Sequence, residues 1–491
     1  MKVWLCLGAV VLLAALATTT VTGQRGGAFR ESRDHPAIRY SDGPRHDAVT
    51  ALDRAVQAGE VALVFEPTSG YLRSVLEALD VPVESQLTVF SETSFQAHRI
   101  NPENPRAIYF NDTVAVGWVR GGDVLEVASL DPTQGVLFFS IDQQPTDRPQ
   151  IRRNDQCLAC HLSWDTLGVP GLLTFSTLPM PDDPNAYAVG WVTDHRSPLQ
   201  ERWGSWYVTG APPSVRHLGN TTEPIEYVPG ASTDPTPALD TLEGLFDLRG
   251  YPTPYSDLVA LLVLEHRTHM TNLLVRMGWE TRVADYEAAR AGRPPADQAA
   301  AIRDTAVELV DYLLFVDEAP LPPGIRSTSG FGDRFSAQGP FDSRDRSLHQ
   351  LDLDGRLLRY PCSFLIYTDA FDALPERAKD AVYRRMWDVL SGQATDDRYT
   401  RLTLDDRRAV ADYLACFHPA IRGWIGSPGQ TDRLVQGLRA EYRKLPLDGG
   451  GYTMDHTASV FPFDAAGRFV TTVGPHEPRE YALPKIRRAM S

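Results

Sequence analysis

The spacing of apolar residues changes along the chain and predicts two halves of different character. Residues 47–59 and 71–79 show helical spacing, and residues 61–65 between them form a strand-like run. From residue 87, short runs rich in β-branched and aromatic residues follow one another at 88–90, 107–110, 114–119, 124–127 and 136–141. Gly121-Gly122-Asp123 and residues 131–135 separate some of these runs, as hairpin turns do. We therefore expect a small antiparallel sheet in a mixed α/β N-terminal half.

The second half has a helical pattern. Strand-like runs at 186–192 and 203–209 precede a loop at 216–237 that is rich in Pro, Gly, Thr and Asn. Beyond it, helical spacing recurs at 256–277, 296–315, 375–390 and 404–416, and Thr403 begins a capping-box-like sequence. The expected fold class is α+β, with a mixed domain at 24–237 and a mainly α-helical domain at 238–491.

The N-terminus has the order of a secretory signal. Lys2 precedes an apolar run at 3–17, and small residues follow up to Gly23. The run is shorter than the roughly 20 residues that span a bilayer, although a membrane anchor remains the alternative. We expect a signal peptide at 1–23, a periplasmic or secreted protein, and no transmembrane segment after cleavage.

Composition narrows the function classes. Of 491 residues, 43% are apolar and 23% are charged, which is typical of a globular protein. The formal net charge is −15, and no sustained run of Lys and Arg occurs. A nucleic-acid partner is therefore not expected.

One motif carries recognisable chemistry, Cys157-Leu158-Ala159-Cys160-His161. Cys-x-x-Cys-His is typical of covalent haem c attachment, in which two thiols form thioethers and the histidine binds iron. The pattern predicts one covalent haem c with His161 as the proximal ligand. Trp164, one turn later, is expected to pack on the porphyrin, and an ordinary core tryptophan is the alternative. The alternatives are a thioredoxin-like redox pair and a zinc site, and the latter needs further Cys or His ligands.

The sixth iron position would decide between electron transfer and catalysis. On the helix predicted at 256–277, His266 lies in the middle of an apolar face, Met270 follows one turn later, and Arg267 is expected to point away. His266, Met270 and Met180 are the candidate distal ligands or pocket residues. A core histidine with a hydrogen-bond partner has the same signature. His195 and His217 are weaker candidates, expected on the surface or in loops.

Two further cysteines remain, Cys362 and Cys416. Export would place them in an oxidising compartment, where a disulfide between them is expected. Two separate buried thiols are the alternative.

Several short runs together resemble a family of large, uncharacterised, exported bacterial c-type cytochromes with a single haem. The runs are 157–161 through 169–171, 193–195, 202–207, 263–266 and 359–362. The resemblance implies haem binding and electron transfer.

The expected function is one-electron transfer in the periplasm, with a redox protein or a small-molecule donor or acceptor as partner. A simple electron-transfer protein needs only about a hundred residues, near one typical domain. The length of this chain therefore indicates a function beyond electron transfer. The alternatives are a haem-dependent oxidoreductase with an open sixth position, acting on peroxide or a small substrate, and a structural or sensory haem protein that docks on a partner.

Overall fold

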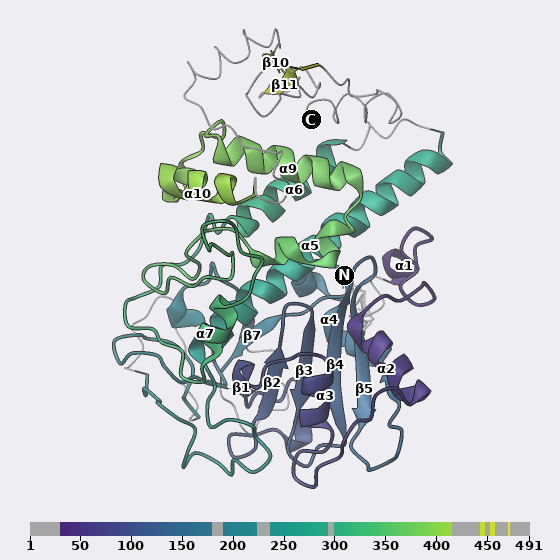
Figure 1. Ribbon diagram of the computed structural model, residues 1–491, viewed down its shortest axis with the longest axis vertical. Helices are drawn as coiled ribbons and strands as arrows, with labels where there is room; N and C mark the ends of the chain where they lie inside the picture. Colours follow the sequence, from purple (N-terminus) through teal and green to yellow (C-terminus); the bar gives the residue numbers. More distant parts are fainter. Residues whose placement is uncertain are drawn as a thin grey trace, which may run out of the picture. The chain divides into compact units, whose positions relative to one another are not determined.

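Figure 1 shows the computed structural model, and the chain divides into two units. The structure describes residues 30–178, 190–222, 236–292, 299–414, 442–446, 452–456 and 470–471. The first unit lies within Met1–Trp387 and Asp396–Leu402, and the second lies within Asp388–Thr395 and Thr403–Ser491.

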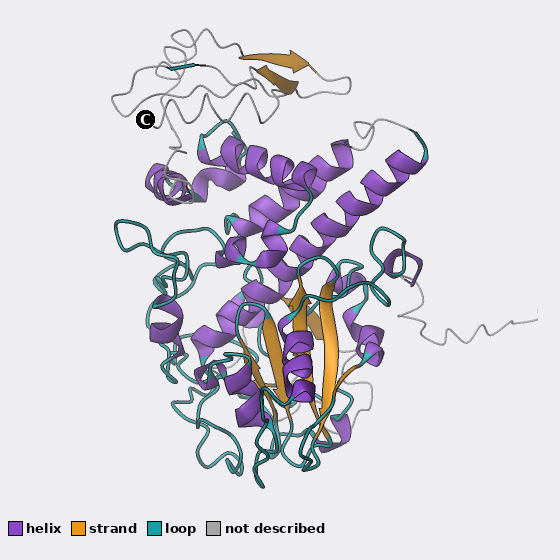
Figure 2. Ribbon diagram, turned by 45° about the vertical axis from the view of Figure 1, so that its right-hand side comes forward, coloured by secondary structure: helices purple, strands orange, loops and turns teal. Residues whose placement is uncertain are grey.

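A seven-stranded antiparallel sheet is the centre of the first unit (Figure 2). Its strand order is β6-β5-β4-β3-β2-β1-β9. The strands are β1 (Leu87–Val89), β2 (Arg106–Phe110), β3 (Val114–Trp118), β4 (Val124–Asp131), β5 (Gly135–Asp142), β6 (Ile151–Arg153) and β9 (Trp206–Tyr207). Strands β2 to β6 follow one another as a meander, whereas β9 returns from farther along the chain to pair with β1. A separate two-stranded sheet joins β7 (Thr174–Thr177) to β8 (Gly190–Thr193).

The turn between β4 and β5 shows how local chemistry fixes the meander. The Asp131 carboxylate accepts hydrogen bonds from the backbone N–H groups of Thr133 and Gln134, both at 2.9 Å. Gly135 has a φ of +91°, a conformation that glycine adopts without steric cost. A Cβ at Gly135 would lie 2.6 Å from Val275, so this turn also packs closely against a helix.

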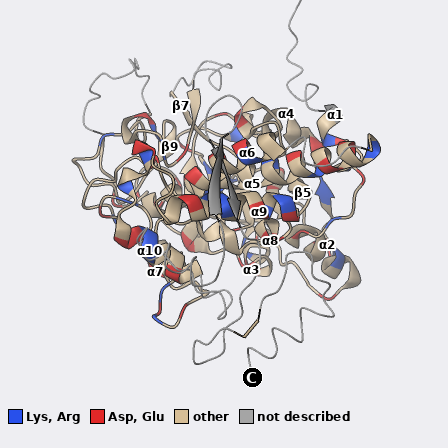
Figure 3. Ribbon diagram, turned by 90° about the horizontal axis from the view of Figure 1, so that it is seen from above, with Lys and Arg blue, Asp and Glu red and all other residues tan. Residues whose placement is uncertain are grey.

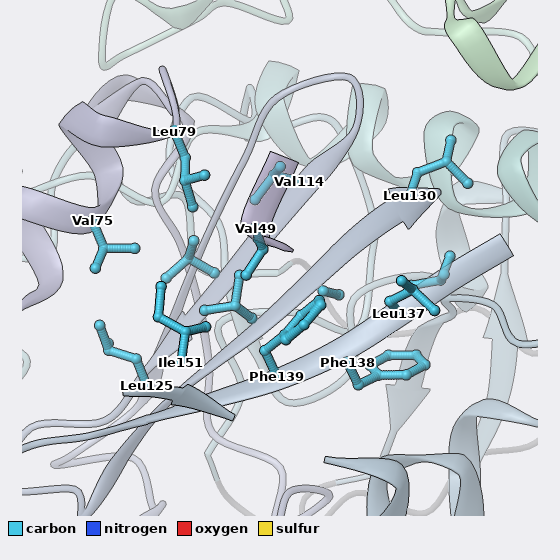
Figure 4. Close-up of a cluster of buried hydrophobic side chains, with 14 of the residues drawn as sticks. Val49, Val75, Leu79, Val114, Leu125, Leu130, Leu137, Phe138, Phe139 and Ile151 are labelled. Atoms are coloured by element: carbon cyan, nitrogen blue, oxygen red, sulfur yellow. The ribbon is translucent and has the colours of Figure 1, made fainter. Parts of the chain in front are cut away.

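Two helices, α2 (Ala48–Ala58) and α3 (Leu72–Ala78), contribute apolar side chains to the same core as the sheet (Figure 4). The Asp47 carboxylate caps α2 by accepting two backbone N–H groups, and Gly59 ends the helix in the left-handed conformation. The core takes Val49 from α2, Val75 from α3 and strand residues such as Leu137 and Phe139. Burial of these side chains is the main stabilising contribution to this unit.

Helix α5 (Leu258–Arg290) is the longest helix described, and Asp257 caps it. Its N-terminal two-thirds are buried almost all round, which is typical of a helix enclosed by other elements. Trp279 Nε1 donates to the carbonyl of Gln134 at 3.2 Å, and Val275 packs at the β4–β5 turn. This helix therefore connects the sheet to the helical part of the first unit.

The remaining helices are short or amphipathic. They are α1 (Arg30–Arg33), α4 (Leu158–His161), α6 (Ala299–Leu313), α7 (Phe331–Ser336), α8 (Asp369–Asp372), α9 (Glu376–Leu390) and α10 (Leu404–Leu414). The second unit contains α10 and a hairpin of β10 (Tyr442–Pro446) and β11 (Tyr452–His456), in which Tyr442 pairs with His456. Acidic and basic residues are interspersed along the described ribbon (Figure 3). In the described ranges, no helix has the length and apolar content needed to cross a membrane.

The mixed α/β architecture, its antiparallel sheet and the helical C-terminal half are confirmed, and the sheet is larger than expected. The strand expected at 61–65 was wrong. This segment pairs with no strand in the described structure, Val64 is 63% exposed, and its N–H bonds to the Ser74 hydroxyl instead. The domain division at residues 237 and 238 stays a prediction, and the signal peptide at 1–23 lies outside the described residues.

Candidate functional site

The Cys-x-x-Cys-His motif forms a short helical segment directly after the edge strand β6. The 3₁₀ turn at Asp155–Cys157 begins at Asn154, whose side chain accepts from the N–H of Gln156 at 3.2 Å. Helix α4 follows and places Leu158 in the core, where it is 3% exposed. Leu162, just after the helix, is fully buried. These two leucines anchor the motif. Cys157 also packs against the core, whereas Cys160 is exposed.

The loop after the motif is held against α5. The amide of Asn272 receives the N–H of Leu172 at 2.9 Å and donates to the carbonyl of Leu172 at 2.6 Å. A Cβ at Gly171 would lie 2.2 Å from the Asn272 side-chain oxygen, so a larger residue would have to displace the Asn272 amide. The backbone beside the motif is therefore fixed by a residue about 110 positions later in the chain.

His161 is oriented by that same loop. Its Nδ1 lies 3.0 Å from the carbonyl of Gly171, and its own carbonyl accepts the N–H of Gly171 at 2.9 Å. Since a carbonyl only accepts, Nδ1 carries the proton and Nε2 keeps its lone pair. Burial lowers the pKa of His161 to about 4, and its ring centroid lies 4.9 Å from that of Phe138. The imidazole is therefore neutral at pH 7, with its proton on Nδ1.

The two thiols of the motif have different surroundings. Cys157 is partly buried, and burial raises its pKa to about 12. Cys160 is exposed. Both are free thiols, so the described structure presents a reduced pair beside a neutral imidazole.

The arrangement supplies soft donors without a complete ligand cage. Within the described ranges, no three Cys, His, Asp or Glu side chains converge as a metal-binding group. A four-coordinate zinc site would require more ligands than the motif provides. Thiolates instead favour copper(I) among the common transition metals, and a reduced thiol pair also permits disulfide exchange.

His266 and Met270 lie in the core of α5, and both are fully buried. His266 Nε2 lies 2.7 Å from the Ser363 hydroxyl, and its Nδ1 lies 2.8 Å from Nδ1 of His195. Burial lowers the pKa of His266 to about 3. His266 is therefore a histidine with partners on both nitrogens, which was the stated alternative to a ligand.

His195 and His217 both lie in loops, which was one of the two expected placements, but they are not on the surface. Both are 3% exposed, and the His195 ring stacks on Tyr312 with 3.9 Å between centroids. Arg267 was expected to point away from the core but is 1% exposed, because α5 is enclosed on nearly all sides. Trp164 is not a core residue, because it is 80% exposed where the chain has left the helix at Leu162.

A buried ion pair that sequence reasoning missed lies beside the histidine pair. Arg202 Nη1 and Glu265 Oε2 are 2.9 Å apart, and the side chains are 1% and 0% exposed. The Thr193 hydroxyl also donates to Glu265 at 2.8 Å. Glu265 directly precedes His266 in the helix predicted at 256–277. Only knowledge that this helix is buried on nearly all sides would have indicated that Glu265 needs a charged partner.

Two predicted site residues fall outside the described residues. Met180 is one of them, and Cys416 is the other, so the Cys362–Cys416 disulfide stays a prediction. Cys362 itself is a fully buried free thiol, and burial raises its pKa.

The SCO1/SenC family model matches residues 402–491. This family comprises copper chaperones and thioredoxin-like proteins and is not a cytochrome c family. The match contradicts the predicted c-type cytochrome, so the covalent haem c, the haem-based electron transfer and the two haem-based alternatives were wrong. The physical reason is that Cys157-x-x-Cys160-His161 specifies two thiols and an imidazole within one turn, and these donors do not by themselves select a porphyrin.

No curated protein and no solved structure shows a significant match to the chain. Over residues 402–491, the chain is similar to the SCO1/SenC family.

Proposed function

We propose that the chain is an exported copper-binding protein that delivers copper during the assembly of a copper-containing oxidase. The observation that carries this proposal is the SCO1/SenC match over residues 402–491. Copper is the cargo in this proposal, and the recipient is a partner protein. The predicted signal peptide supports the compartment, because it would export the chain.

The residue types of the matched segment favour copper binding over dithiol exchange. The segment contains a single cysteine, Cys416, so it cannot form a disulfide within itself. It also contains three histidines and two methionines, His418, His456, His476, Met454 and Met490. Thiolate and thioether groups suit copper(I), and imidazole suits copper in either common oxidation state.

Copper binding tests the proposal directly. The full mature chain is titrated anaerobically with copper(I) in competition with a chromophoric chelator, and the Cys416→Ser/His456→Ala variant is compared with it. We expect the variant to bind copper in the segment at least about tenfold more weakly, because ligand loss exceeds the effect of a lost outer-shell contact.

The control for this test is His98→Ala. His98 is an exposed histidine outside the matched segment, so its loss should leave copper affinity unchanged. Absence of copper binding by the wild-type chain, or equal affinity of wild type and the double variant, would overturn the proposal.

A further inference from the structure

We propose that Cys157 and Cys160 form a thiol–disulfide exchange site for the disulfides of other exported proteins, with Cys160 as the attacking thiol and Cys157 as the resolving thiol. The pair lies in the first unit and outside the SCO1/SenC match, so this activity is separate from the proposed copper delivery. The exchange needs two thiols and a disulfide but no metal ion. The predicted export would bring the pair to its substrates, because disulfides persist outside the cytoplasm.

The backbone places the two cysteines at the separation that a disulfide needs. Cys157 has φ −57° and ψ −27°, and Leu158 has φ −64° and ψ −14°, so the chain is already helical at these residues. Helix α4 continues this turn through Cys160. Cα atoms three residues apart in a helix lie about 5 Å from each other, and those of a disulfide are usually about 4.4–6.8 Å apart. Side-chain rotation therefore closes a Cys157–Cys160 disulfide with little movement of the backbone.

Neighbouring contacts hold this turn in both redox states. The N–H of Cys157 donates to the carbonyl of Asn154 at 3.4 Å, and the N–H of Leu162 donates to the carbonyl of Leu158 at 3.2 Å. Leu158 and Leu162 are buried in the core. None of these contacts uses a sulfur atom, so the turn should persist when the pair is oxidised or reduced.

Unequal exposure assigns the two roles. Cys160 is exposed, so a disulfide on the surface of another protein can reach its sulfur. Cys157 is partly buried and packs against the core, which a folded partner cannot enter. It lies one turn from Cys160, and attack by a group of the same chain has a large advantage over attack by an outside thiol. Cys160 therefore reacts first, and Cys157 completes the exchange.

The exchange consists of two displacement steps. The Cys160 thiolate attacks one sulfur of the partner's disulfide, which forms a mixed disulfide and releases the first partner thiolate. The Cys157 thiolate then attacks the Cys160 sulfur, which forms the Cys157–Cys160 disulfide and releases the second partner thiolate. Two electrons pass to the partner, and the two protons that the cysteines lose balance those that the released thiolates take up. A dithiol protein that reverses both steps returns the pair to its reduced form.

Disulfide mapping of the full mature chain tests the site without any substitution. The folded protein is incubated with oxidised glutathione at pH 8, its remaining thiols are alkylated, and its cysteine peptides are identified by mass spectrometry. We expect an intramolecular Cys157–Cys160 disulfide. A chain that keeps both thiols reduced, or that carries glutathione on both, overturns the proposal.

Single variants test the two roles. Cys157→Ser should stop at a mixed disulfide between glutathione and Cys160, whereas Cys160→Ser should form a mixed disulfide at Cys157 at least about tenfold more slowly. Cys362→Ala is the control, because it removes a fully buried thiol outside the motif and should react as the wild type does. A faster reaction at Cys157 than at Cys160 would contradict the assigned roles.

Insulin serves as the protein disulfide and dithiothreitol as the reductant in the activity assay. The wild type should accelerate insulin reduction, and Cys157→Ser/Cys160→Ser should not. Equal rates for the two proteins overturn the activity on protein disulfides. Circular dichroism verifies folding of each variant, and disulfide mapping of the wild type decides the question if the serine pair unfolds the chain.

Copper titration of the same proteins distinguishes this site from the proposed function. Cys157→Ser/Cys160→Ser should retain copper(I) binding in the matched segment, and Cys416→Ser/His456→Ala should still form the Cys157–Cys160 disulfide. Intact exchange in a chain that binds no copper overturns only the proposed function. Intact copper binding in a chain without exchange overturns only this site.

Discussion

Replacing Arg202 by methionine should destabilise the first unit by about 3–5 kcal/mol, the usual cost of removing one partner of a buried ion pair. Arg202 donates to Glu265 and also to the carbonyls of His195 and Ser197, at 2.5 to 2.9 Å. After the substitution, the Thr193 hydroxyl still donates to the Glu265 carboxylate, but no positive charge compensates it there. Native domains are stable by only about 5–15 kcal/mol, so the loss is a large fraction of the total.

The loss should also depend on pH in a defined direction. Burial already raises the pKa of Glu265, and Arg202 opposes that shift. Without Arg202, the Glu265 carboxyl of the folded variant stays protonated at pH values at which the same carboxyl of the unfolded chain has lost its proton. The folded state then binds more protons, so the variant loses stability as pH rises, by at most about 1.4 kcal/mol per pH unit.

Urea unfolding followed by tryptophan fluorescence at pH 5, 6, 7 and 8 measures both effects. Arg249→Met is the matched control, because Arg249 pairs with Asp247 at an exposed position and should not change the midpoint. Adding Glu265→Leu to Arg202→Met should restore much of the stability, since no buried charge then remains. A loss below about 1 kcal/mol, or a loss that does not vary with pH, would refute the reasoning.

Three further predictions concern the fold. Gly135→Ala should lower the unfolding free energy by more than about 1 kcal/mol, measured in urea, because its φ is positive and its Cβ would lie 2.6 Å from Val275. Asp47→Ala should cost about 1 kcal/mol in the same assay by leaving two N–H groups of α2 without their cap. His217 and His266 have pKa values lowered to about 3 by burial, so stability should fall as pH decreases from about 6.5 toward 3. His217→Leu should flatten that dependence, and an unchanged slope would contradict the assignment.

Local chemistry made much of the fold predictable. The cap and stop of α2 are visible in the sequence as Asp47 and Gly59, and the turn between β4 and β5 is visible as Asp131 to Gly135. The pairing of β9 with β1 was not visible, because it joins segments more than a hundred residues apart. The prediction of a strand at 61–65 was wrong for a related reason. A strand needs a neighbouring strand to pair with, and apolar spacing along one segment does not show whether such a neighbour exists.

The buried polar groups of α5 could not have been predicted from periodicity. A helical wheel assigns residues to one apolar face, whereas this helix is enclosed on nearly all sides. The partners of His266 lie 71 and 97 positions away along the chain, and the partner of Glu265 lies 63 positions away. Only the tertiary fold supplies these contacts, so a polar residue in such a helix cannot be assigned a function before its neighbours are known.

The function of the motif at residues 157–161 likewise cannot be assigned before its neighbours are known. Its donor atoms are fixed by the sequence, but its ligand depends on what surrounds them. The structure adds a neutral imidazole oriented by Gly171, a pair of thiols with unequal burial, and no third converging ligand in the described residues. Thiols and an imidazole serve dithiol exchange as well as metal binding, so these donor atoms alone do not decide between the two.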